Sequence, residues 1–114
     1  MKPLEVKIEH VGTRGSKCLF CNKTGQYLIT IIAGNSQSCE LEKFLQYDQC
    51  IDRKKFIVYD GKVMFNMCED HVLKLIYAFS GLSTLPADFF QQITIEDFKE
   101  ALEIGIHMPK MAPV

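Results

Sequence analysis

Two short pairs of candidate metal ligands are the part of the sequence best suited to chemistry. Two residues separate Cys18 from Cys21, and two residues separate Cys68 from His71. Zinc prefers four tetrahedral ligands, and thiolates and imidazoles bind it well. A gap of two residues lets both side chains of a pair reach one ion from a single tight turn. These four residues therefore predict one closed Zn2+ site.

The distance between the two pairs leaves an alternative open. The pairs are separated by 46 residues, at positions 22–67, whereas gaps of roughly 12–20 residues are more usual. In the alternative interpretation, the cysteines are buried free thiols and His71 is a surface residue. Cys39 and Cys50 have no partner at this spacing, and we interpret both as small buried apolar residues.

The composition fits one ordinary globular domain. The chain has 114 residues, 47% hydrophobic and 24% charged, and its formal net charge is −1. This charge gives no electrostatic reason to expect nucleic acid or an anionic membrane as a partner, and no apolar run approaches the length of a membrane span. An odd number of cysteines and an N-terminus without a signal-peptide core argue against a secreted disulfide framework. We expect a single cytoplasmic, zinc-stabilised domain over residues 1–114, with no small-molecule substrate.

Four strands are expected around the ligands. Residues 4–10 alternate apolar and charged side chains, and residues 26–33 form a β-branched run. Residues 55–59 and 62–66 are joined by an Asp-Gly step, which is a favoured two-residue hairpin turn. Together these runs predict antiparallel strands that include one hairpin.

A turn is expected directly after the first ligand pair. Residues 22–25, Asn-Lys-Thr-Gly, have turn chemistry, and Gly25 can adopt a positive φ. The chain would then double back so that backbone amides point at the sulfur atoms. This is the shape that a zinc knuckle requires.

One helix is predicted between the two ligand pairs, and another is predicted to begin at the second pair. Ser38 is expected to cap an inserted helix over residues 38–48. Asn66 and Glu69 match a capping box for a second helix, which begins at the second ligand pair and ends at Gly81. Thiolates at a helix N-terminus are favoured by the helix dipole and by free backbone amides, so this placement has a physical reason.

The C-terminal part, residues 82–106, is expected to be helical. A short helix is predicted to begin at Pro86 and to contain two phenylalanines. A second helix is predicted over residues 95–104, where a capping pattern precedes apolar residues at helical spacing. The expected fold class is therefore α+β.

The order of a knuckle, antiparallel strands with a hairpin, and a helix that carries the second ligand pair resembles a treble-clef zinc finger. The ligand segments also resemble the small N-terminal zinc-binding domain of the ClpX unfoldase subunit. This resemblance is carried by the segments Cys18–Lys23, Ile31–Gly34 and Cys68–Val72. It implies an interaction domain that pairs with itself and receives substrates and adaptors.

The sequence departs from the ClpX-type domain in several respects. That family usually has cysteine where His71 stands, and it closes the second pair soon after the Ala-Gly step. Here some 33 residues intervene, including the predicted inserted helix. This chain also contains no Gly-x4-Gly-Lys-Ser/Thr phosphate loop, so it carries no ATPase module of that kind.

A candidate protein-contact surface lies on the helix after the second ligand pair. This helix is apolar around more than half of its circumference. We predict that Leu75, Ile76 and Phe79 contact a protein partner or a second copy of the chain. The alternative is that the C-terminal helices fold back over this face.

A candidate nucleic-acid contact is the basic cluster Arg53, Lys54 and Lys55, which has aromatic neighbours. The alternative for this cluster is a solvated turn. No catalytic arrangement is evident, because His10 and His107 are expected at surface or capping positions. A four-ligand zinc site would also leave no coordination position for water.

We therefore predict a non-enzymatic zinc-binding domain that interacts with another protein or with itself and has a regulatory role. The alternative function is a nucleic-acid-associated zinc-finger regulator. Affinity purification with nuclease treatment distinguishes the two functions. A protein partner that is retained after treatment supports the first function, and loss of every retained molecule supports the second.

Overall fold

The computed structural model describes residues 3–12, 16–81, 84 and 88–103. In this part of the chain the fold is α+β, with one five-stranded antiparallel sheet and three α-helices. The strands are β1 (Leu4–His10), β2 (Tyr27–Ile32), β3 (Phe56–Tyr59), β4 (Lys62–Met67) and β5 (Asp88–Ile93). The helices are α1 (Gly34–Lys43), α2 (Glu69–Ser80) and α3 (Ile95–Ala101). A π-helical turn, Phe44–Asp48, extends α1, and a short 3-10 turn, Arg53–Lys55, precedes β3.

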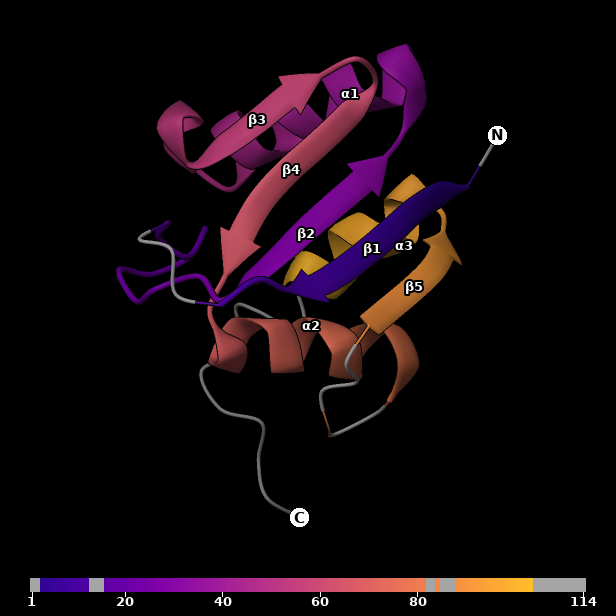
Figure 1. The fold of residues 1–114 in the computed structure, drawn as a ribbon. Helices are drawn as coiled ribbons and strands as arrows, with labels where there is room; N and C mark the ends of the chain where they lie inside the picture. Colours follow the sequence, from indigo (N-terminus) through magenta and orange to yellow (C-terminus); the bar gives the residue numbers. More distant parts are fainter. Residues whose placement is uncertain (1–2, 13–15, 82–83, 85–87, 104–114) are drawn as a thin grey trace.

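The sheet has the strand order β3-β4-β2-β1-β5, and every neighbouring pair is antiparallel. β1 lies between β2 and β5, so the first strand of the chain also pairs with the last one (Figure 1). The described part of the chain is thereby closed into one unit by long-range pairing.

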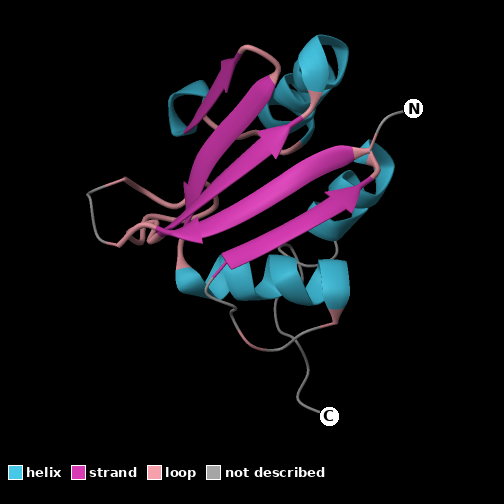
Figure 2. Cartoon of the chain, turned by 45° about the vertical axis from the view of Figure 1, so that its right-hand side comes forward, coloured by secondary structure: helices cyan, strands magenta, loops and turns pink. Residues whose placement is uncertain are grey.

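One face of the sheet is buried and the other face carries no helix. Leu4, Val6 and Ile8 of β1 are buried, whereas the charged residues between them are not. The register repeats this alternation across the sheet, because Val6 faces Ile31 and Ile31 faces Val63. The helices lie on the buried side (Figures 1 and 2), and we call the opposite side the open face.

The core between the sheet and the helices is one continuous apolar cluster. Each helix contributes fully buried side chains, among them Leu41 of α1, Leu75 of α2 and Phe98 of α3. Burial of such side chains is the main source of stability for a domain of this size. None of the described helices combines the length and the apolar character that a membrane crossing needs.

The predicted strands and the hairpin are confirmed. β3 and β4 pair across the turn formed by Asp60 and Gly61, which both have positive φ values, 52° and 74°. Two positive φ values are typical of the type I′ turn that favours an Asp-Gly step. This turn matches the twist of the two strands.

The inserted helix begins earlier than predicted. α1 starts at Gly34, whose φ of 70° lets the chain leave β2 and turn directly into a helix. Ser38 is therefore not a cap, because it is buried within α1 and its hydroxyl donates to the carbonyl of Asn35 at 2.9 Å. The predicted range of 38–48 corresponds to the second half of α1 and the π-helical turn.

The first predicted C-terminal helix is wrong. Phe89 and Phe90 lie in β5, which pairs with β1 over six residues. Phe89 faces the core and Phe90 faces solvent, as alternation in a strand requires. Without β5, the outer backbone groups of β1 would lack partners, so tertiary pairing decides the structure here. Pro86 lies outside the described residues.

The second predicted C-terminal helix is confirmed as α3. The Thr94 hydroxyl oxygen accepts a hydrogen bond from the Asp97 amide at 3.1 Å, which is an N-cap contact. The helix ends at Ala101 and is continued by a short π-type turn. Residue 104, the last of the predicted range, lies outside the described residues.

Candidate metal centre

The first ligand pair lies in a tight loop between β1 and β2. Lys17 and Thr24 form an isolated antiparallel bridge at the base of this loop. Within the loop, the Cys18 amide donates to the Lys23 carbonyl at 2.9 Å. The chain thus doubles back around Cys18 and Cys21, as predicted for a knuckle.

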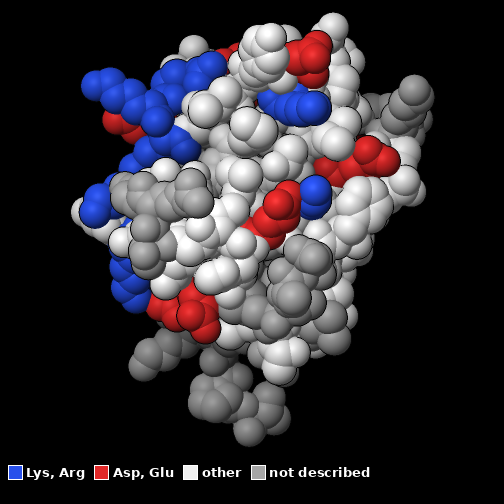
Figure 3. Space-filling view, in the orientation of Figure 1, with Lys and Arg blue, Asp and Glu red and all other residues white. Residues whose placement is uncertain are grey.

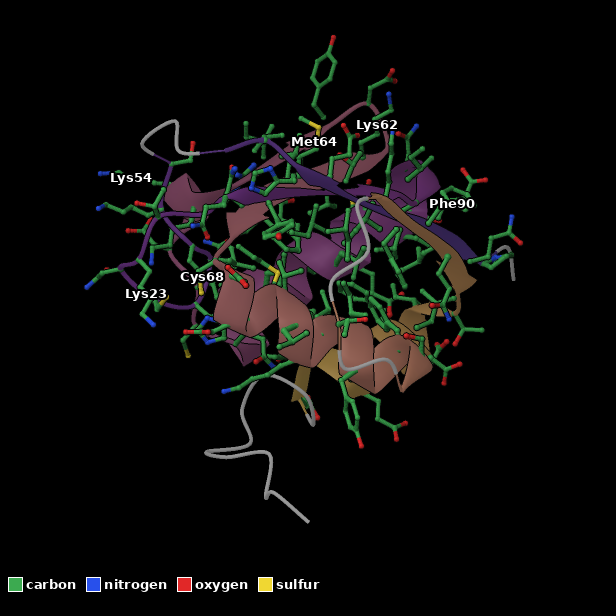
Figure 4. The ribbon with its side chains drawn as sticks, turned by 60° about the horizontal axis from the view of Figure 1, so that its bottom comes forward. Lys23, Lys54, Lys62, Met64, Cys68 and Phe90 are labelled. Atoms are coloured by element: carbon green, nitrogen blue, oxygen red, sulfur yellow. The ribbon has the colours of Figure 1, made fainter. Side chains whose placement is uncertain are left out.

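The second ligand pair lies at the start of α2. Cys68 is the N-cap residue, with an extended backbone, and its carbonyl accepts the Val72 amide at 3.0 Å. Figure 4 shows Cys68 at this end of α2, beside the loop that carries Lys23. Asn66, predicted to be the cap, lies instead in β4, so the predicted helix start is confirmed but its capping residue is corrected.

Close backbone packing holds the knuckle against the end of β4. The Leu19 amide donates to the Asn66 carbonyl at 2.8 Å, and the Asn66 side-chain amide donates to the Gly25 carbonyl at 3.2 Å. A Cβ atom at position 25 would lie 2.6 Å from the Asn66 Cβ. Gly25 does not adopt the positive φ that its lack of a side chain would allow. Glycine is required there because the two backbones approach so closely.

The four predicted ligands converge on one point. Sγ of Cys18, Cys21 and Cys68 and one ring nitrogen of His71 all lie within 4.8 Å of one another. The Cys21 and Cys68 sulfurs are 3.7 Å apart. His71 Nδ1 lies 3.5 Å from the Cys18 sulfur and 3.2 Å from the Cys68 sulfur.

These separations fit a single tetrahedral metal ion. With Zn–S bonds of about 2.3 Å and a Zn–N bond of about 2.0 Å, tetrahedral angles give edges of about 3.8 Å between sulfurs and about 3.6 Å between sulfur and nitrogen. The donor set of three thiolates and one imidazole is one that zinc prefers. The cluster is therefore a candidate metal site, and zinc suits its geometry.

The environment of the cluster shifts the pKa values of the Cys68 and Cys21 thiols in opposite directions. Burial raises the pKa of Cys68 to about 12. A hydrogen bond from the His71 backbone opposes this shift in pKa, and the charge of Cys18 adds to it. Burial also opposes ionisation of Cys21, but hydrogen bonds from the Lys23 backbone and the neighbouring thiols leave the pKa of Cys21 below its usual value. A bound divalent cation would stabilise three thiolates together.

Two lysines support the cluster, and sequence reasoning assigned neither of them to it. Lys55 Nζ donates to the carbonyls of Cys18 and Cys21 at 3.3 and 3.4 Å. Lys23 Nζ lies 2.7 Å from a carboxylate oxygen of Asp70, which links the knuckle to the first turn of α2. Both partners of this ion pair are exposed, so its contribution to stability is small. No sequence motif connects Lys55 with the knuckle, because only the folded hairpin brings them together.

The predicted contact residues on α2 belong to the core. Leu75 and Ile76 are fully buried within this chain, so no partner can contact them in the folded state. Phe79 is half-buried, and its ring centroid lies 6.2 Å from that of Phe89 and 6.0 Å from that of Phe98. The alternative that we stated for this helix therefore holds, because C-terminal elements cover its apolar side.

Two side chains of the basic cluster, Arg53 and Lys55, have partners within the chain. Arg53 Nε lies 3.0 Å from Glu42, and its Nη1 donates to the Phe56 carbonyl at 2.7 Å. Lys55 is bound to the knuckle carbonyls. Within the described residues, Lys54 is the one member of this cluster that is exposed without an ion-pair partner. Two of the three basic side chains therefore have partners within the chain.

The remaining cysteines differ from our prediction. Cys39 and Cys50 are both exposed rather than buried. Cys39 lies on the solvent side of α1, because the helix buries Ser38 and Leu41 instead. His10 is exposed at the end of β1, as expected, and its ring contacts Tyr27 at a centroid distance of 5.0 Å. His107 lies outside the described residues.

Comparison of the chain with protein-family models, with curated proteins and with solved structures found no match. The interpretation of the site therefore rests on its residues and their geometry.

Proposed function

We propose that this chain is a non-enzymatic domain in which a structural zinc ion, held by Cys18, Cys21, Cys68 and His71, stabilises a surface that binds another protein. The observation that carries the zinc assignment is the convergence of these four side chains within 4.8 Å. Their spacing along the chain and their separations in space agree with one tetrahedral site.

A structural role for the ion is supported by the number of ligands. Four protein ligands complete a tetrahedral shell, whereas catalytic zinc sites keep one position for water or substrate. Glu69 and Asp70 are exposed acids of the first turn of α2, and Asp70 pairs with Lys23. Their position at a helix N-terminus is favoured by the dipole without any catalytic role.

The treble-clef resemblance remains part of this proposal. A knuckle supplies one ligand pair and a helix N-terminus supplies the other, which is the arrangement that the resemblance implies. The resemblance to the ClpX-type domain rests on the motifs alone. A cytoplasmic location also remains a proposal, supported by exposed free thiols at Cys39 and Cys50, which persist best in a reducing compartment.

Binding of a protein is supported by what the surface presents. Large apolar side chains of β3 and β5, namely Ile57, Tyr59 and Phe90, project from the open face. Exposed apolar groups that cluster on one face are typical of interaction sites. The nucleic-acid alternative has less support, because Arg53 and Lys55 already have partners within the chain.

Two measurements test the proposal. Native mass spectrometry of protein purified without chelator should show one zinc ion per chain, and its absence would refute the metal assignment. Affinity purification from the native cell, with a nuclease-treated control, should retain a protein partner after nuclease treatment. Loss of every retained molecule on nuclease treatment would favour the nucleic-acid alternative instead.

A further inference from the structure

An exposed apolar strip crosses the open face on three neighbouring strands. We define this strip as Leu28 of β2, Ile57 and Tyr59 of β3, and Met64 of β4. Ile57 and Met64 face each other in the register, and Tyr59 is paired with Lys62. Ile57 and Tyr59 are 57% and 75% exposed. Side chains that are exposed to this extent contribute little to the packing of this chain.

Two shallow hollows lie along the strip. One hollow, of about 440 Å³, is lined by the apolar residues Leu28, Ile57 and Met64 and by Lys17 and Lys54. A smaller hollow, of about 150 Å³, is lined by Ile57, Tyr59, Lys62 and Met64. Figure 4 shows Met64 and Lys62 projecting from the sheet on the side away from the helices.

In the described part of the chain, three of the four lysines that line these hollows have no side-chain partner, and the fourth, Lys55, donates to the knuckle carbonyls. Lys17, Lys54 and Lys62 have no ion-pair partner in the part of the chain that the structure describes, whereas Lys7, Lys23, Arg53 and Lys99 each have one. Asp52 also lines the larger hollow, but its carboxylate accepts the Lys54 amide at 2.9 Å and caps the 3-10 turn. Figure 3 shows basic side chains gathered along the left side of this face with uncharged side chains beside them, and acidic and basic side chains also lie near its centre and right.

We propose that the open face around this strip binds an extended segment of a partner protein that contains both acidic and apolar residues. Apolar side chains of the segment would cover the strip, and its carboxylates would reach Lys17, Lys54 and Lys62. Three unpaired cations beside an apolar surface are complementary to such a segment in both charge and hydrophobicity. This inference rests on the proposed role of the domain in binding another protein.

The composition of the strip favours a peptide over single-stranded nucleic acid. Bases bind to sheet surfaces mainly by stacking on aromatic rings, and Tyr59 is the one aromatic member of the strip. Leu28, Ile57 and Met64 are instead suited to aliphatic and aromatic side chains, and methionine adapts its shape to different partners. The strip and its two hollows lie on the face of the sheet, so the segment is expected to lie over this face rather than extend the sheet at the edge of β3.

The test selects ligands with the zinc-loaded chain of residues 1–114 as bait. A displayed library of random peptides of about ten residues, long enough to cross the strip at ~3.3 Å per residue, is enriched on the immobilised protein. We expect the enriched sequences to contain Asp or Glu among Leu, Ile and Phe. Dissociation constants of the enriched peptides are then measured by fluorescence anisotropy.

Matched variants locate the binding surface. Tyr59→Ser should weaken peptide binding by about tenfold, whereas Tyr47→Ser, at a tyrosine that is 68% exposed on the helical side, should leave it unchanged. Lys62→Glu should weaken binding by about three- to tenfold and make it less sensitive to salt. Lys43→Glu on α1 makes the same charge change away from the strip and should have no such effect. Thermal unfolding and zinc content of each variant confirm that the fold is retained.

Several results would overturn the inference. One is a selection that enriches no peptides containing both acidic and apolar residues. Another is equal peptide binding by the strip variants and their control variants. Tighter binding of a fluorescent oligo(dT), in competition with the peptides, would assign the face to nucleic acid. Concentration-dependent dimerisation that Tyr59→Ser abolishes would assign it to a second copy of the chain.

The outcome is separable from that of the proposed function. If the wild-type chain retains no protein from its native cell, both the protein-binding role and this inference fail. If it retains proteins that the Tyr59→Ser and Lys62→Glu variants retain equally well, only the assignment of the open face fails.

Discussion

The four ligand side chains differ in how deeply they lie. Cys18 and Cys68 are buried, whereas Cys21 and His71 are partly exposed. A metal ion held among them would therefore be shielded on one side by the core and accessible from the other. Because buried thiolates without a cation are costly, the site couples metal binding directly to the packing around Cys18 and Cys68.

Replacing a buried ligand should remove the metal and destabilise the fold. We expect Cys18→Ser to lose zinc and to lower the thermal midpoint by roughly 10 °C or more, because loss of a structural metal is among the most destabilising single changes. Cys39→Ser is the matched control, since that thiol is exposed and outside the cluster. Differential scanning fluorimetry and elemental analysis measure both effects. An unchanged midpoint in Cys18→Ser would show that the metal is not structural.

Lys55 offers a test of how the protein supports the knuckle from outside the ligand set. Its ammonium group donates to the carbonyls of both Cys18 and Cys21. Lys55→Gln should lower the thermal midpoint by a few degrees and weaken zinc binding, measured in competition with a chelator of known affinity. Lys54→Gln, at the exposed neighbour, should change neither quantity. Equal behaviour of the two variants would contradict the role of Lys55.

At the level of elements, the knuckle and the end of β4 are fitted together at Gly25 and Asn66. Any side chain at position 25 would collide with Asn66, whose Cβ would be 2.6 Å from the new Cβ. Separation of the two segments would also strain the hydrogen bond between the Leu19 amide and the Asn66 carbonyl. The position of the first ligand pair relative to α2 therefore depends on a glycine that binds no metal itself.

Gly25→Ala should destabilise the protein by about 2 kcal/mol or more and lower its zinc affinity, because the collision involves a Cβ atom and backbone rather than a flexible side-chain end. Gly81→Ala is an informative comparison. This substitution should destabilise the protein by only about 1 kcal/mol, because position 81 has a left-handed backbone at φ 73° but open space around the new methyl group. It should leave zinc affinity unchanged. Chemical denaturation and zinc titration would show whether the two variants differ in this way.

The elements that local chemistry determines were predictable, and those that long-range pairing determines were not. The Asp60-Gly61 turn, the Thr94 cap and the alternation in β1 each carry their own signal in adjacent residues. Phe89 and Phe90 have no comparable signal, since a short apolar run fits a helix or a strand until β1 offers it a free edge. The grouping of Cys18, Cys21, Cys68 and His71 was predictable from their spacing, whereas the contacts of Lys55 and the close approach at Gly25 depend on the fold.

At the level of the whole molecule, two features hold the described chain together. One is the continuous apolar core under the sheet, which includes buried residues from all five strands and all three α-helices. The other is the candidate metal site at one end of the sheet, where the knuckle, β4 and α2 meet. The open face belongs to the same rigid sheet, so its apolar strip is positioned by the core and is separate from the cluster itself.

Removal of the metal should therefore loosen one end of the molecule rather than unfold all of it. After treatment with a chelator, amide hydrogen exchange should accelerate at residues 17–25 and in the first turn of α2, where the ligands lie. Amides of β1 and β2 should stay protected, because their pairing and the core beneath them do not involve the metal. Peptide-level exchange monitored by mass spectrometry, with and without zinc restored, measures both regions in one experiment. Loss of protection across β1 and β2 on chelation would instead show that the core cannot hold the sheet together without the metal, and the division between core and cluster would fail.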